Sequence, residues 1–339
     1  MINFPQKFTD FFFSFGLMFI GLVLLFIFSL TAENSGNKSG FFPKSSPRTE
    51  INAPDSSTKF PNSKPVFPLQ KSNEVFSSTN MAVSLLALDV LTDKMLFEKN
   101  IEEIRPLASI TKLMTAMVLL DLPIDWNTST KILDSDCDSS SHQLKSGEVF
   151  KLSDLWNVAL VGSSNSAIKA LVRNSGVSEE SFVALMNKKA KNLNLNSFVF
   201  SESTGLDAKN IGHARDVAFL LKESLKSEKI LKTLQIGEYY TKPLSKEKSR
   251  RIYSTNWLLI DWVPNNFSAS CIVGKTGFIN DSGYNFVVRL ADEQNHQIIV
   301  VVLGAKDNEA RFSEARDLGG WVFHHYVWPD EEGYAALAK

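Results

Sequence analysis

Three short motifs contain the side chains that nucleophilic catalysis by a serine requires. The first is Ser109-Ile110-Thr111-Lys112, in which a hydroxyl and an amine stand three residues apart. On a helix this spacing puts both groups on one face, close enough for a hydrogen bond. A serine hydroxyl becomes a good nucleophile when a base accepts its proton, and an uncharged lysine can be that base. Ser109 is therefore predicted to be a nucleophile, with Lys112 as its base.

The spacing S-x-x-K is not specific by itself, because it also begins at Ser35, Ser56, Ser166 and Ser245. Ser109 differs from these serines in two ways. It stands at the start of an apolar stretch with helical periodicity, and two further motifs follow it in order. These motifs are Ser163-Ser164-Asn165 and Lys275-Thr276-Gly277, the only K-T-G in the chain. The combination argues against a chance occurrence at Ser109.

Ordered S-x-x-K, S-x-N and K-T-G motifs are used by serine β-lactamases and penicillin-binding proteins. Within that superfamily, residues 81–326 resemble the D-alanyl-D-alanine carboxypeptidases, which are low-molecular-mass penicillin-binding proteins. Seven pieces occur in the order typical of that family. They are the segment from Arg105 to Ala116, the S-x-N motif, Ser203-Thr204-Gly205-Leu206-Asp207, Ala214-Arg215-Asp216, Ser254-Thr255-Asn256-Trp257-Leu258-Leu259, the K-T-G motif and Gly283-Tyr284-Asn285-Phe286.

The resemblance implies a role for each residue near the nucleophile. Ser109 would attack the carbonyl of the penultimate D-alanine of a stem peptide and form an acyl-enzyme. Lys112 would be the acylation base, which requires an uncharged amine and hence a lowered pKa. Ser163 would relay the proton to the leaving amine, and Asn165 would position Lys112 and the substrate amide.

The third motif and its neighbours would bind the substrate. The resemblance implies that Lys275 and Thr276 hold the terminal carboxylate, which a cationic site favours. Arg215 would either join them or be a surface residue at the start of a helix. Gly277 would let the strand backbone approach the ligand closely. The oxyanion would lie between the backbone N–H groups of the nucleophile and Phe278. No metal ion and no cofactor is part of the predicted site.

The activity that the resemblance implies is that of a serine-type D-Ala-D-Ala carboxypeptidase, which removes the terminal D-alanine of peptidoglycan stem peptides. β-Lactam antibiotics would then be covalent inhibitors. A peptidoglycan DD-endopeptidase that uses the same site remains an alternative. A serine β-lactamase is disfavoured because no E-x-x-L-N segment lies between Ser163 and Lys275. A catalytically silent wall-binding protein is disfavoured because the reactive side chains are all present.

Composition argues against several other functions. The 339 residues carry 36 Lys and Arg against 37 Asp and Glu, so the net charge of -1 provides no field for binding nucleic acid. The five histidines have no metal-ligand spacing, and Cys137 and Cys271 form no CxxC motif. A metal or redox enzyme is therefore not expected. Whether the two cysteines form a disulfide stays open, because the sequence does not reveal their separation.

The elements that must position these residues follow from hydrophobic periodicity. A β-hairpin and three further strands are predicted from apolar runs at 82–90, 94–98, 267–278, 283–291 and 297–304. Helices are predicted over 110–121, 153–173, 179–195, 214–226 and 308–323. Strands at both ends with helices between them predict an α+β domain. Its antiparallel sheet would be built from both ends of the domain, with flanking helices and an inserted all-helical lobe, as in the β-lactamase/transpeptidase-like fold.

The N-terminal part differs from the rest in composition. Residues 11–32 carry no charge and as a helix would reach roughly 33 Å, enough to cross a bilayer core of about 30 Å. A cleaved signal peptide is the alternative, but the run is longer than a usual apolar signal core. Residues 33–78 are rich in Ser, Pro, Asn and Lys, which predicts a disordered tether. The expected order is a cytoplasmic N-terminus (1–10), a single-pass membrane anchor (11–32), the tether and a penicillin-binding serine peptidase domain (79–339) outside a bacterial cell membrane.

Overall fold

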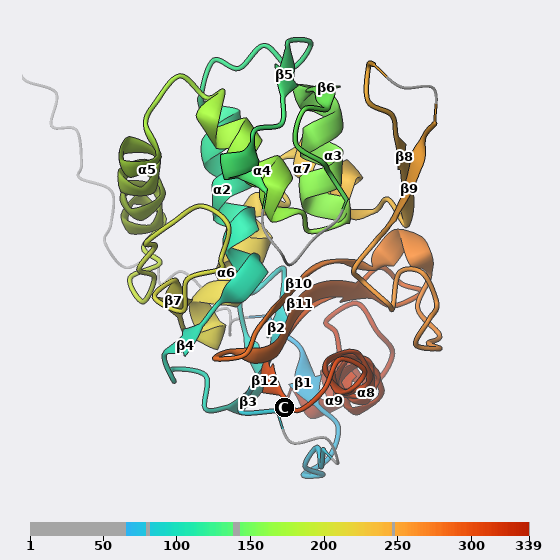
Figure 1. Ribbon diagram of the computed structural model, residues 1–339. Coiled ribbons are helices and arrows are strands. Elements are labelled where there is room, and N and C mark those ends of the chain that lie inside the picture. Colours follow the sequence, from blue (N-terminus) through green and yellow to red (C-terminus); the bar gives the residue numbers. More distant parts are fainter. Residues whose placement is uncertain (1–65, 79–81, 138–142, 246–247, 339) are drawn as a thin grey trace, which may run out of the picture. The chain divides into compact units, whose positions relative to one another are not determined.

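The computed structural model describes residues 66–78, 82–137, 143–245 and 248–338 (Figure 1). The described domain contains a five-stranded antiparallel sheet with the strand order β10-β11-β12-β2-β3. The early strands are β2 (Ser84–Asp89) and β3 (Met95–Lys99), and the late strands are β10 (Val273–Ile279), β11 (Gly283–Ala291) and β12 (Gln297–Ala305). β12 pairs with β2, with Val300 opposite Ala87, so the sheet joins the two ends of the domain. The predicted α+β fold is confirmed.

The central strands are apolar on both faces because each face meets a different core. Val301 of β12 belongs to the cluster shared with the helical lobe, whereas Val300 and Val302 belong to the cluster shared with α8 (Ala310–His325). Successive side chains of a strand point to opposite faces, so a continuous run of β-branched residues fills both cores. α8 therefore covers one face of the sheet, and α6 (Ala214–Ser224) packs on the other.

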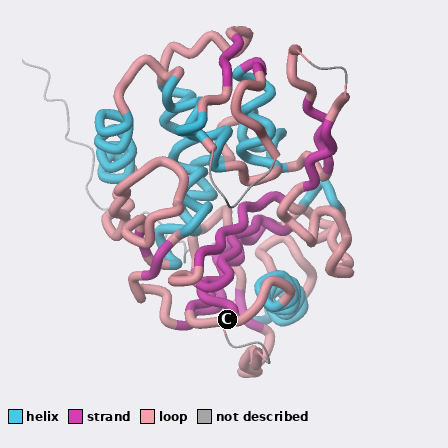
Figure 2. Tube along the Cα trace, viewed as in Figure 1, coloured by secondary structure: helices cyan, strands magenta, loops and turns pink. Residues whose placement is uncertain are grey.

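A predominantly helical lobe is inserted between β3 and β10, above the sheet in Figures 1 and 2. Besides α6, it contains α2 (Thr111–Asp121), α3 (Leu152–Val161), α4 (Asn165–Arg173), α5 (Glu179–Asn192) and α7 (Glu228–Leu234). The helices predicted over 110–121, 179–195 and 214–226 are confirmed, and α7 was not predicted. The segment that carries Ser109 lies at the start of this lobe, and the K-T-G strand β10 follows its end.

The single helix predicted over 153–173 is wrong, because the chain forms two helices separated by residues 162–164. Ser164 starts the second helix, since its Oγ accepts a hydrogen bond from the Ala167 backbone N–H at 3.3 Å and caps α4. A Cβ on Gly162 would lie 2.5 Å from the Ile252 side chain, so a larger residue does not fit there. The break leaves Ser163 in a left-handed conformation with a φ of +57°.

Short strand pairs connect segments of the chain that carry no periodic signal. They are β4 (Arg105–Pro106) with β7 (Ile211–Gly212), β5 (Ser129–Lys131) with β6 (Val149–Lys151), and β8 (Glu238–Thr241) with β9 (Arg250–Tyr253). Runs of two to four residues contain too little pattern to be predicted. The strand predicted over 267–278 begins later, at Val273, after a 3-10 turn at Ala269–Cys271. Cys271 and Cys137 are both free thiols.

Residues 66–78 pack against the domain, although their composition predicts a tether. β1 (Leu69–Gln70) pairs with β13 (Tyr326–Val327), which precedes the short helix α9 (Tyr334–Leu337). Phe76 lies in an aromatic cluster with Phe97 and Trp321, at ring-centroid distances of 5.4 and 5.9 Å. The folded domain therefore begins before residue 79. The predicted anchor at 11–32 and most of the predicted tether lie outside the described residues, and no helix within the described ranges is long and apolar enough to cross a membrane.

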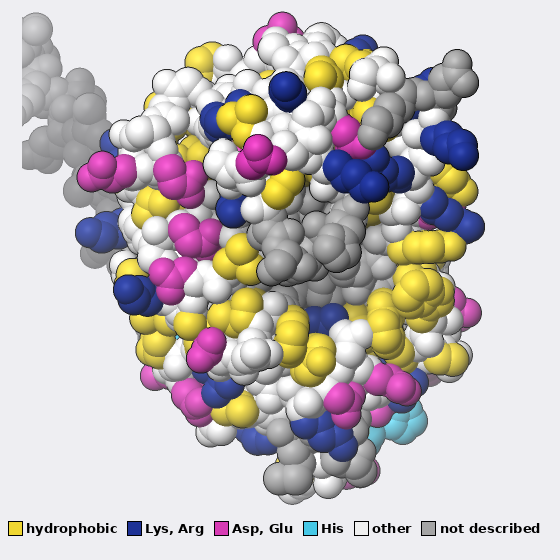
Figure 3. Space-filling view, in the orientation of Figure 1, with side chains coloured by type: hydrophobic (Ala, Val, Ile, Leu, Met, Phe, Trp, Pro, Cys, Tyr) yellow, Lys and Arg dark blue, Asp and Glu magenta, His cyan; other side chains and the backbone are white. Residues whose placement is uncertain are grey.

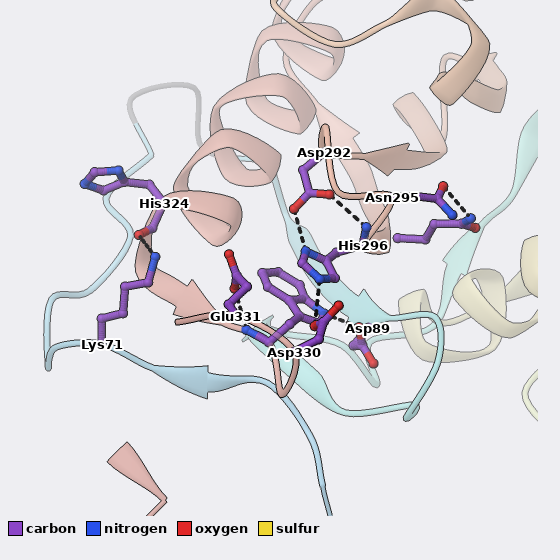
Figure 4. A network of polar contacts seen from close by, with 10 residues as sticks. Lys71, Asp89, Asp292, Asn295, His296, His324, Asp330 and Glu331 are labelled. Atoms are coloured by element: carbon purple, nitrogen blue, oxygen red, sulfur yellow. Dashed lines mark hydrogen bonds and ion pairs between the residues drawn. The ribbon is translucent and has the colours of Figure 1, made fainter. Parts of the chain in front are cut away.

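A histidine between two aspartates links the C-terminal segment to the sheet (Figure 4). The His296 ring contacts Asp292 at 2.7 Å and Asp330 at 3.0 Å, and it stacks on Trp328. Trp328 Nε1 donates to Asp89 on β2 at 2.9 Å. Burial of the ring acts to lower the pKa of His296, but the hydrogen bonds to the two carboxylates outweigh this effect and raise it. The protonated ring thus joins the β11–β12 turn to the C-terminal segment.

The raised pKa of His296 predicts that this link stabilises the fold most in acid. The folded state binds the proton more tightly, so the contribution is complete below the unfolded pKa of about 6.5 and is lost as the pH rises through the folded value. Asp330→Asn should therefore lower the thermal unfolding midpoint more at about pH 5.5 than at about pH 9. Glu332→Gln, an exposed carboxylate of the same segment, is the control. An equal loss at both pH values would mean that Asp330 acts through packing and not through charge.

Candidate active site

The chain before α2 is strained and presents Ser109 while its neighbours stay buried. Ser109 lies in the 3-10 turn η1 (Ala108–Ile110) and is partly exposed, whereas the residues on either side are fully buried. Ala108 has a φ of +49°, in the left-handed region that residues with a Cβ rarely adopt. Asn285 of β11 holds this conformation, because its Nδ2 donates to the backbone oxygens of the two residues before Ala108, at 3.0 and 3.3 Å.

The amine of Lys112 lies beside the Ser109 hydroxyl, one helical turn along the chain. Its Nζ is 2.8 Å from Ser109 Oγ, and it donates to Asn165 Oδ1 at 2.5 Å and to the Thr204 backbone oxygen at 2.6 Å. Lys112 is fully buried, so protein groups replace the water that an amine would otherwise bind. Asn165 is the first residue of α4, and the structure therefore brings the S-x-x-K and S-x-N motifs together.

A turn at residues 202–207 delivers the Thr204 oxygen to this amine. The Glu202 carboxylate accepts hydrogen bonds from the Thr204 backbone N–H and from the Asn210 side chain, both at 2.6 Å, and so closes the turn. Gly205 has a φ of +89°, and a Cβ there would lie 2.0 Å from the Ala108 oxygen. Glu202 and Asn210 were not predicted as site residues. The only signal for this turn was the resemblance of residues 203–207 to the family.

A second buried amine approaches from the sheet. Lys275 on β10 is 1% exposed, and its Nζ donates to Ser163 Oγ at 2.7 Å. Desolvation lowers the pKa of Lys275 well below its ordinary value, and the Lys112 amine when it is protonated and the Arg311 guanidinium lower it further. The left-handed backbone of Ser163, between α3 and α4, allows its hydroxyl to reach β10. The S-x-N and K-T-G motifs therefore meet between the helical lobe and the sheet.

The next two residues of β10 form the edge beside the nucleophile. Thr276 Oγ1 donates to Thr255 Oγ1 at 2.7 Å, on the segment that follows β9. A Cβ on Gly277 would lie 2.7 Å from the Leu107 oxygen and 3.2 Å from the Ser109 nitrogen, so the strand runs directly past the nucleophile backbone. An oxyanion site between the two backbones requires this closeness.

The end of β10 is supported by α8. Arg311 Nη1 donates to the Gly277 oxygen at 3.0 Å, and its guanidinium lies 5.3 Å from the centre of the Tyr284 ring. Burial lowers the pKa of Arg311 to about 9, although Tyr284 acts in the opposite direction. Phe278 is 46% exposed and stacks on the same ring at a centroid distance of 4.2 Å. Arg311 was not predicted, because a single arginine on a helix forms no motif.

Arg215 is the predicted site residue that the structure does not bring to the others. It is the second residue of α6, and its guanidinium forms an ion pair with Glu102 at 2.9 Å. Its side chain is 42% exposed, and within the described ranges no hydrogen bond or ion pair joins it to another predicted site residue. The start of α6 is capped by His213, whose Nδ1 accepts from the Asp216 backbone N–H at 3.1 Å. This geometry does not support a carboxylate-binding role for Arg215.

The assembled groups are those of acyl transfer. The Ser109 hydroxyl lies beside the buried Lys112 amine, and the Ser163 hydroxyl lies beside the Lys275 amine. The edge of β10 runs directly past the Ser109 backbone. In the part of the chain that the structure describes, no group of His, Cys, Asp and Glu residues could hold a metal ion.

Comparisons with known proteins agree with this chemistry. The family model described as D-alanyl-D-alanine carboxypeptidase matches residues 71–307. The D-alanyl-D-alanine endopeptidase of Pseudomonas aeruginosa is 31% identical over 246 residues, which are 70% of this chain and 76% of the relative. The D-alanyl-D-alanine carboxypeptidase DacC of Escherichia coli (strain K12) is 31% identical over 259 residues, 71% of this chain and 61% of the relative. The structure of penicillin-binding protein D2 of Listeria monocytogenes, in its cefotaxime-bound form, is similar with a TM-score of 0.61 and 25% identity, and covers 74% of this chain and 100% of its own.

Because burial lowers its pKa, Lys275 is expected to destabilise the folded protein by an amount that depends on pH. The unfolded chain keeps its proton up to a pKa of about 10.4, while the folded protein releases it at lower pH, so stability increases as the pH rises through this window. Lys275→Met should therefore raise the thermal unfolding midpoint at neutral pH, with a gain that shrinks toward about pH 10. Lys191→Met, an exposed lysine of α5, is the matched control. A gain that is the same at every pH would rule out the charge as its cause.

Proposed function

This chain belongs to the D-alanyl-D-alanine carboxypeptidase family, and on that basis we propose that it removes the terminal D-alanine of peptidoglycan stem peptides through an acyl-enzyme on Ser109. The enzyme is a serine-type hydrolase of D-Ala-D-Ala peptides, and β-lactams are expected to acylate the same serine. One observation carries the residue assignment. The amine of Lys112 is fully buried and lies 2.8 Å from the Ser109 hydroxyl.

Acylation begins when the Ser109 hydroxyl gives its proton to the uncharged amine of Lys112. The oxygen attacks the carbonyl carbon of the penultimate D-alanine, and negative charge develops on the carbonyl oxygen. We assign the stabilisation of this charge to the backbone N–H groups of Ser109 and Phe278, which fits a β10 strand that runs beside the nucleophile. Asn165 and Thr204 hold the base in place during the transfer.

The tetrahedral intermediate collapses when the bond between the carbonyl carbon and the leaving amine breaks. That amine must gain a proton, and we assign this transfer to Ser163, whose Oγ lies 2.7 Å from Lys275 Nζ. The proton that Lys112 accepted is returned through Ser163 to the leaving D-alanine. The net charge of the site is therefore the same before and after acylation.

The carboxylate of the leaving D-alanine is proposed to bind at Lys275 and Thr276. An anion beside Lys275 favours the protonated amine, so bound substrate offsets the desolvation that lowers this pKa. Gly277 keeps the strand clear of side-chain atoms at the point where the scissile peptide must lie. Arg215 is not assigned to the carboxylate, because its guanidinium pairs with Glu102.

Hydrolysis of the acyl-enzyme by water completes the reaction and is expected to be slow for a β-lactam adduct. Glu202 is a carboxylate close to the site, but its two oxygens accept hydrogen bonds from Thr204 and Asn210. A carboxylate that is held in a turn in this way is poorly placed to activate water for deacylation. This geometry favours a penicillin-binding protein over a β-lactamase.

Labelling with a fluorescent penicillin, followed by peptide mapping, tests the assignment of the nucleophile. The wild-type protein should carry the label on Ser109 and release free D-alanine from a peptide ending in D-Ala-D-Ala. Ser109→Ala should take no label, and Lys112→Ala should be acylated roughly 10²- to 10⁴-fold more slowly, the usual contribution of a general base. Ser245→Ala is the control, because Ser245 also begins an S-x-x-K sequence but is an exposed residue between β8 and β9. A label on any other residue would overturn the assignment.

Endopeptidase activity on cross-linked stem peptides is the second candidate. It is favoured by the similarity to the Pseudomonas relative, which is named D-alanyl-D-alanine endopeptidase. The same residues would act, with the leaving amine belonging to a neighbouring stem peptide. Digestion of purified cross-linked dimers beside pentapeptide monomers separates the two activities. Preferential cleavage of the dimers would replace the carboxypeptidase assignment.

We further propose that residues 11–32 anchor the enzyme in the bacterial cell membrane, with the catalytic domain on the outer side, where its substrate lies. The support is the charge-free stretch followed by a polar segment. Protease added to intact cells, or to spheroplasts where an outer membrane is present, should release the domain. Full protection in spheroplasts would exclude this orientation. A mature N-terminus at about residue 33 would instead identify a cleaved signal peptide.

A further inference from the structure

A buried arginine lies behind the part of β10 that passes the nucleophile. Arg311 is the second residue of α8, and only 6% of it is exposed. Its Nη1 donates to the backbone oxygen of Gly277 at 3.0 Å and to that of Asn285 at 3.3 Å. The guanidinium therefore joins β10 to β11 at the point where β10 runs beside the Ser109 backbone.

The positive charge of this guanidinium has no counter-ion beside it. Among the described residues no carboxylate forms an ion pair with Arg311, and its Nη2 donates to the neutral Asn308 amide. Arg250, by contrast, pairs with Glu148. Burial lowers the pKa of Arg311 to about 9, as expected for a cation that lacks an anionic partner. Such a charge costs folding free energy, which points to a use of Arg311 other than stability.

The oxygen of Gly277 and the N–H of Phe278 belong to one peptide unit. A trans peptide unit is planar, so its oxygen and its N–H point in opposite directions. The oxygen accepts the hydrogen bond from Arg311, and the N–H is one of the two donors assigned to the oxyanion. Hydrogen bonds at the two ends of such a unit polarise one another. A cation bound at the oxygen therefore makes the Phe278 N–H a stronger donor.

The other oxyanion donor has a neutral group behind it. The Ser109 N–H shares its peptide unit with the Ala108 oxygen, which accepts a hydrogen bond from the Thr111 backbone N–H at the start of α2. This bond closes a helical turn and brings no formal charge. Of the two peptide units assigned to the oxyanion, the unit that carries the Phe278 N–H is the one bonded to a cation.

Solvent screens the charge of Arg311 only weakly. The guanidinium lies between Tyr284 of β11 and Phe312 of its own helix, 5.3 and 4.8 Å from the two ring centres. Figure 3 shows apolar side chains gathered over the sheet below the helical lobe, on the face where β10 and β11 lie in Figure 1. Charges interact more strongly in such surroundings than in water. The charge of Arg311 is accordingly felt inside the site, where it helps to lower the pKa of Lys275.

We propose that Arg311 is a positioning residue that acts through the Gly277–Phe278 peptide unit and strengthens its N–H as a donor to the oxyanion, an inference that rests on the proposed function. Negative charge develops on the carbonyl oxygen of the substrate only as the tetrahedral intermediate forms. Arg311 therefore favours acylation and leaves the binding of the intact peptide unchanged. It makes no contact with the substrate and exchanges no proton with it.

Two substitutions separate the charge from the hydrogen bond. Gln and Lys can both donate to the Gly277 oxygen, but only Lys is a cation. Arg311→Gln should lower the rate constant for acylation by a penicillin about tenfold per titrated active site, which is less than the roughly 10²- to 10³-fold loss on removing a whole oxyanion donor. Arg316→Gln is the matched control, because Arg316 lies on the same helix and pairs with Asp317.

A peptide boronic acid tests the intermediate directly. Ser109 Oγ adds to the boron atom and its proton passes to Lys112, so the adduct is a tetrahedral anion that resembles the intermediate. Arg311→Gln should raise the Ki of this inhibitor about tenfold, as for acylation. The Kd of an intact D-Ala-D-Ala peptide should be the same for Ser109→Ala with and without Arg311→Gln. A purely structural effect would instead lower the thermal unfolding midpoint and the fraction of sites that titrate.

If Arg311→Gln does not fold, Arg311→Lys decides the question. Its buried amine loses its proton as the pH rises, with Tyr284 and Lys275 as titratable neighbours in both proteins. The ratio of its boronic acid Ki to that of the wild type should therefore increase between about pH 6 and about pH 9. A ratio that does not change with pH would reject a role for the charge.

The remaining outcomes separate this proposal from the proposed function. A wild-type protein that is acylated, with Arg311→Gln acylated equally fast per titrated site, would overturn the role of Arg311 alone. An equal loss in acylation and in binding of the intact peptide would also overturn it, because the arginine would then act on the ground state. If the wild-type protein is not acylated by penicillin at all, the proposed function fails and this proposal fails with it.

Discussion

The burial of an amine beside a serine hydroxyl is the constraint on which the rest of this site depends. Lys112 is removed from water, so protein groups have to replace its hydration. Asn165 and the Thr204 backbone do so, and they come from α4 and from the 202–207 turn, far along the chain from α2. A shift of either element would remove one of the amine's hydrogen-bond partners or move the amine away from Ser109. The contact between Lys112 and Ser109 therefore depends on how the elements of the helical lobe are arranged.

The same constraint explains the close backbone packing around the nucleophile. Gly205 and Gly277 approach residues 107–109 at distances that leave no room for a Cβ. Ala108, between them, keeps a left-handed conformation that costs about 1–3 kcal/mol. Asn285 offsets this strain through hydrogen bonds to the preceding backbone. Because β11 belongs to the sheet that joins both ends of the domain, the position of Ser109 depends on the whole sheet.

Charge is used in opposite ways in two parts of the domain. Lys275 lies near Lys112 and Arg311, where burial and repulsion disfavour the charged amine. An amine of this kind is unfavourable for folding but well suited to bind an anion that enters the site. His296, in contrast, has carboxylates on both sides that favour its charge and join two segments of the fold. The first arrangement suits the proposed reaction, whereas the second stabilises the fold.

The sequence by itself predicted the candidate reactive groups and determined most of the framework that carries them. The order of the three motifs predicted Ser109, Lys112 and Lys275, because serine β-lactamases and penicillin-binding proteins use S-x-x-K, S-x-N and K-T-G in that order. Long periodic runs predicted the sheet and most helices. Only the tertiary structure decided that the helix is interrupted before α4 and that residues 66–78 pack on the domain. It also decided that Arg215 pairs with Glu102. The supporting contacts of Glu202, Asn210 and Arg311 were likewise visible only there. These features depend on single contacts between segments far apart in the chain, and a local pattern carries no information about which distant segment will supply the partner.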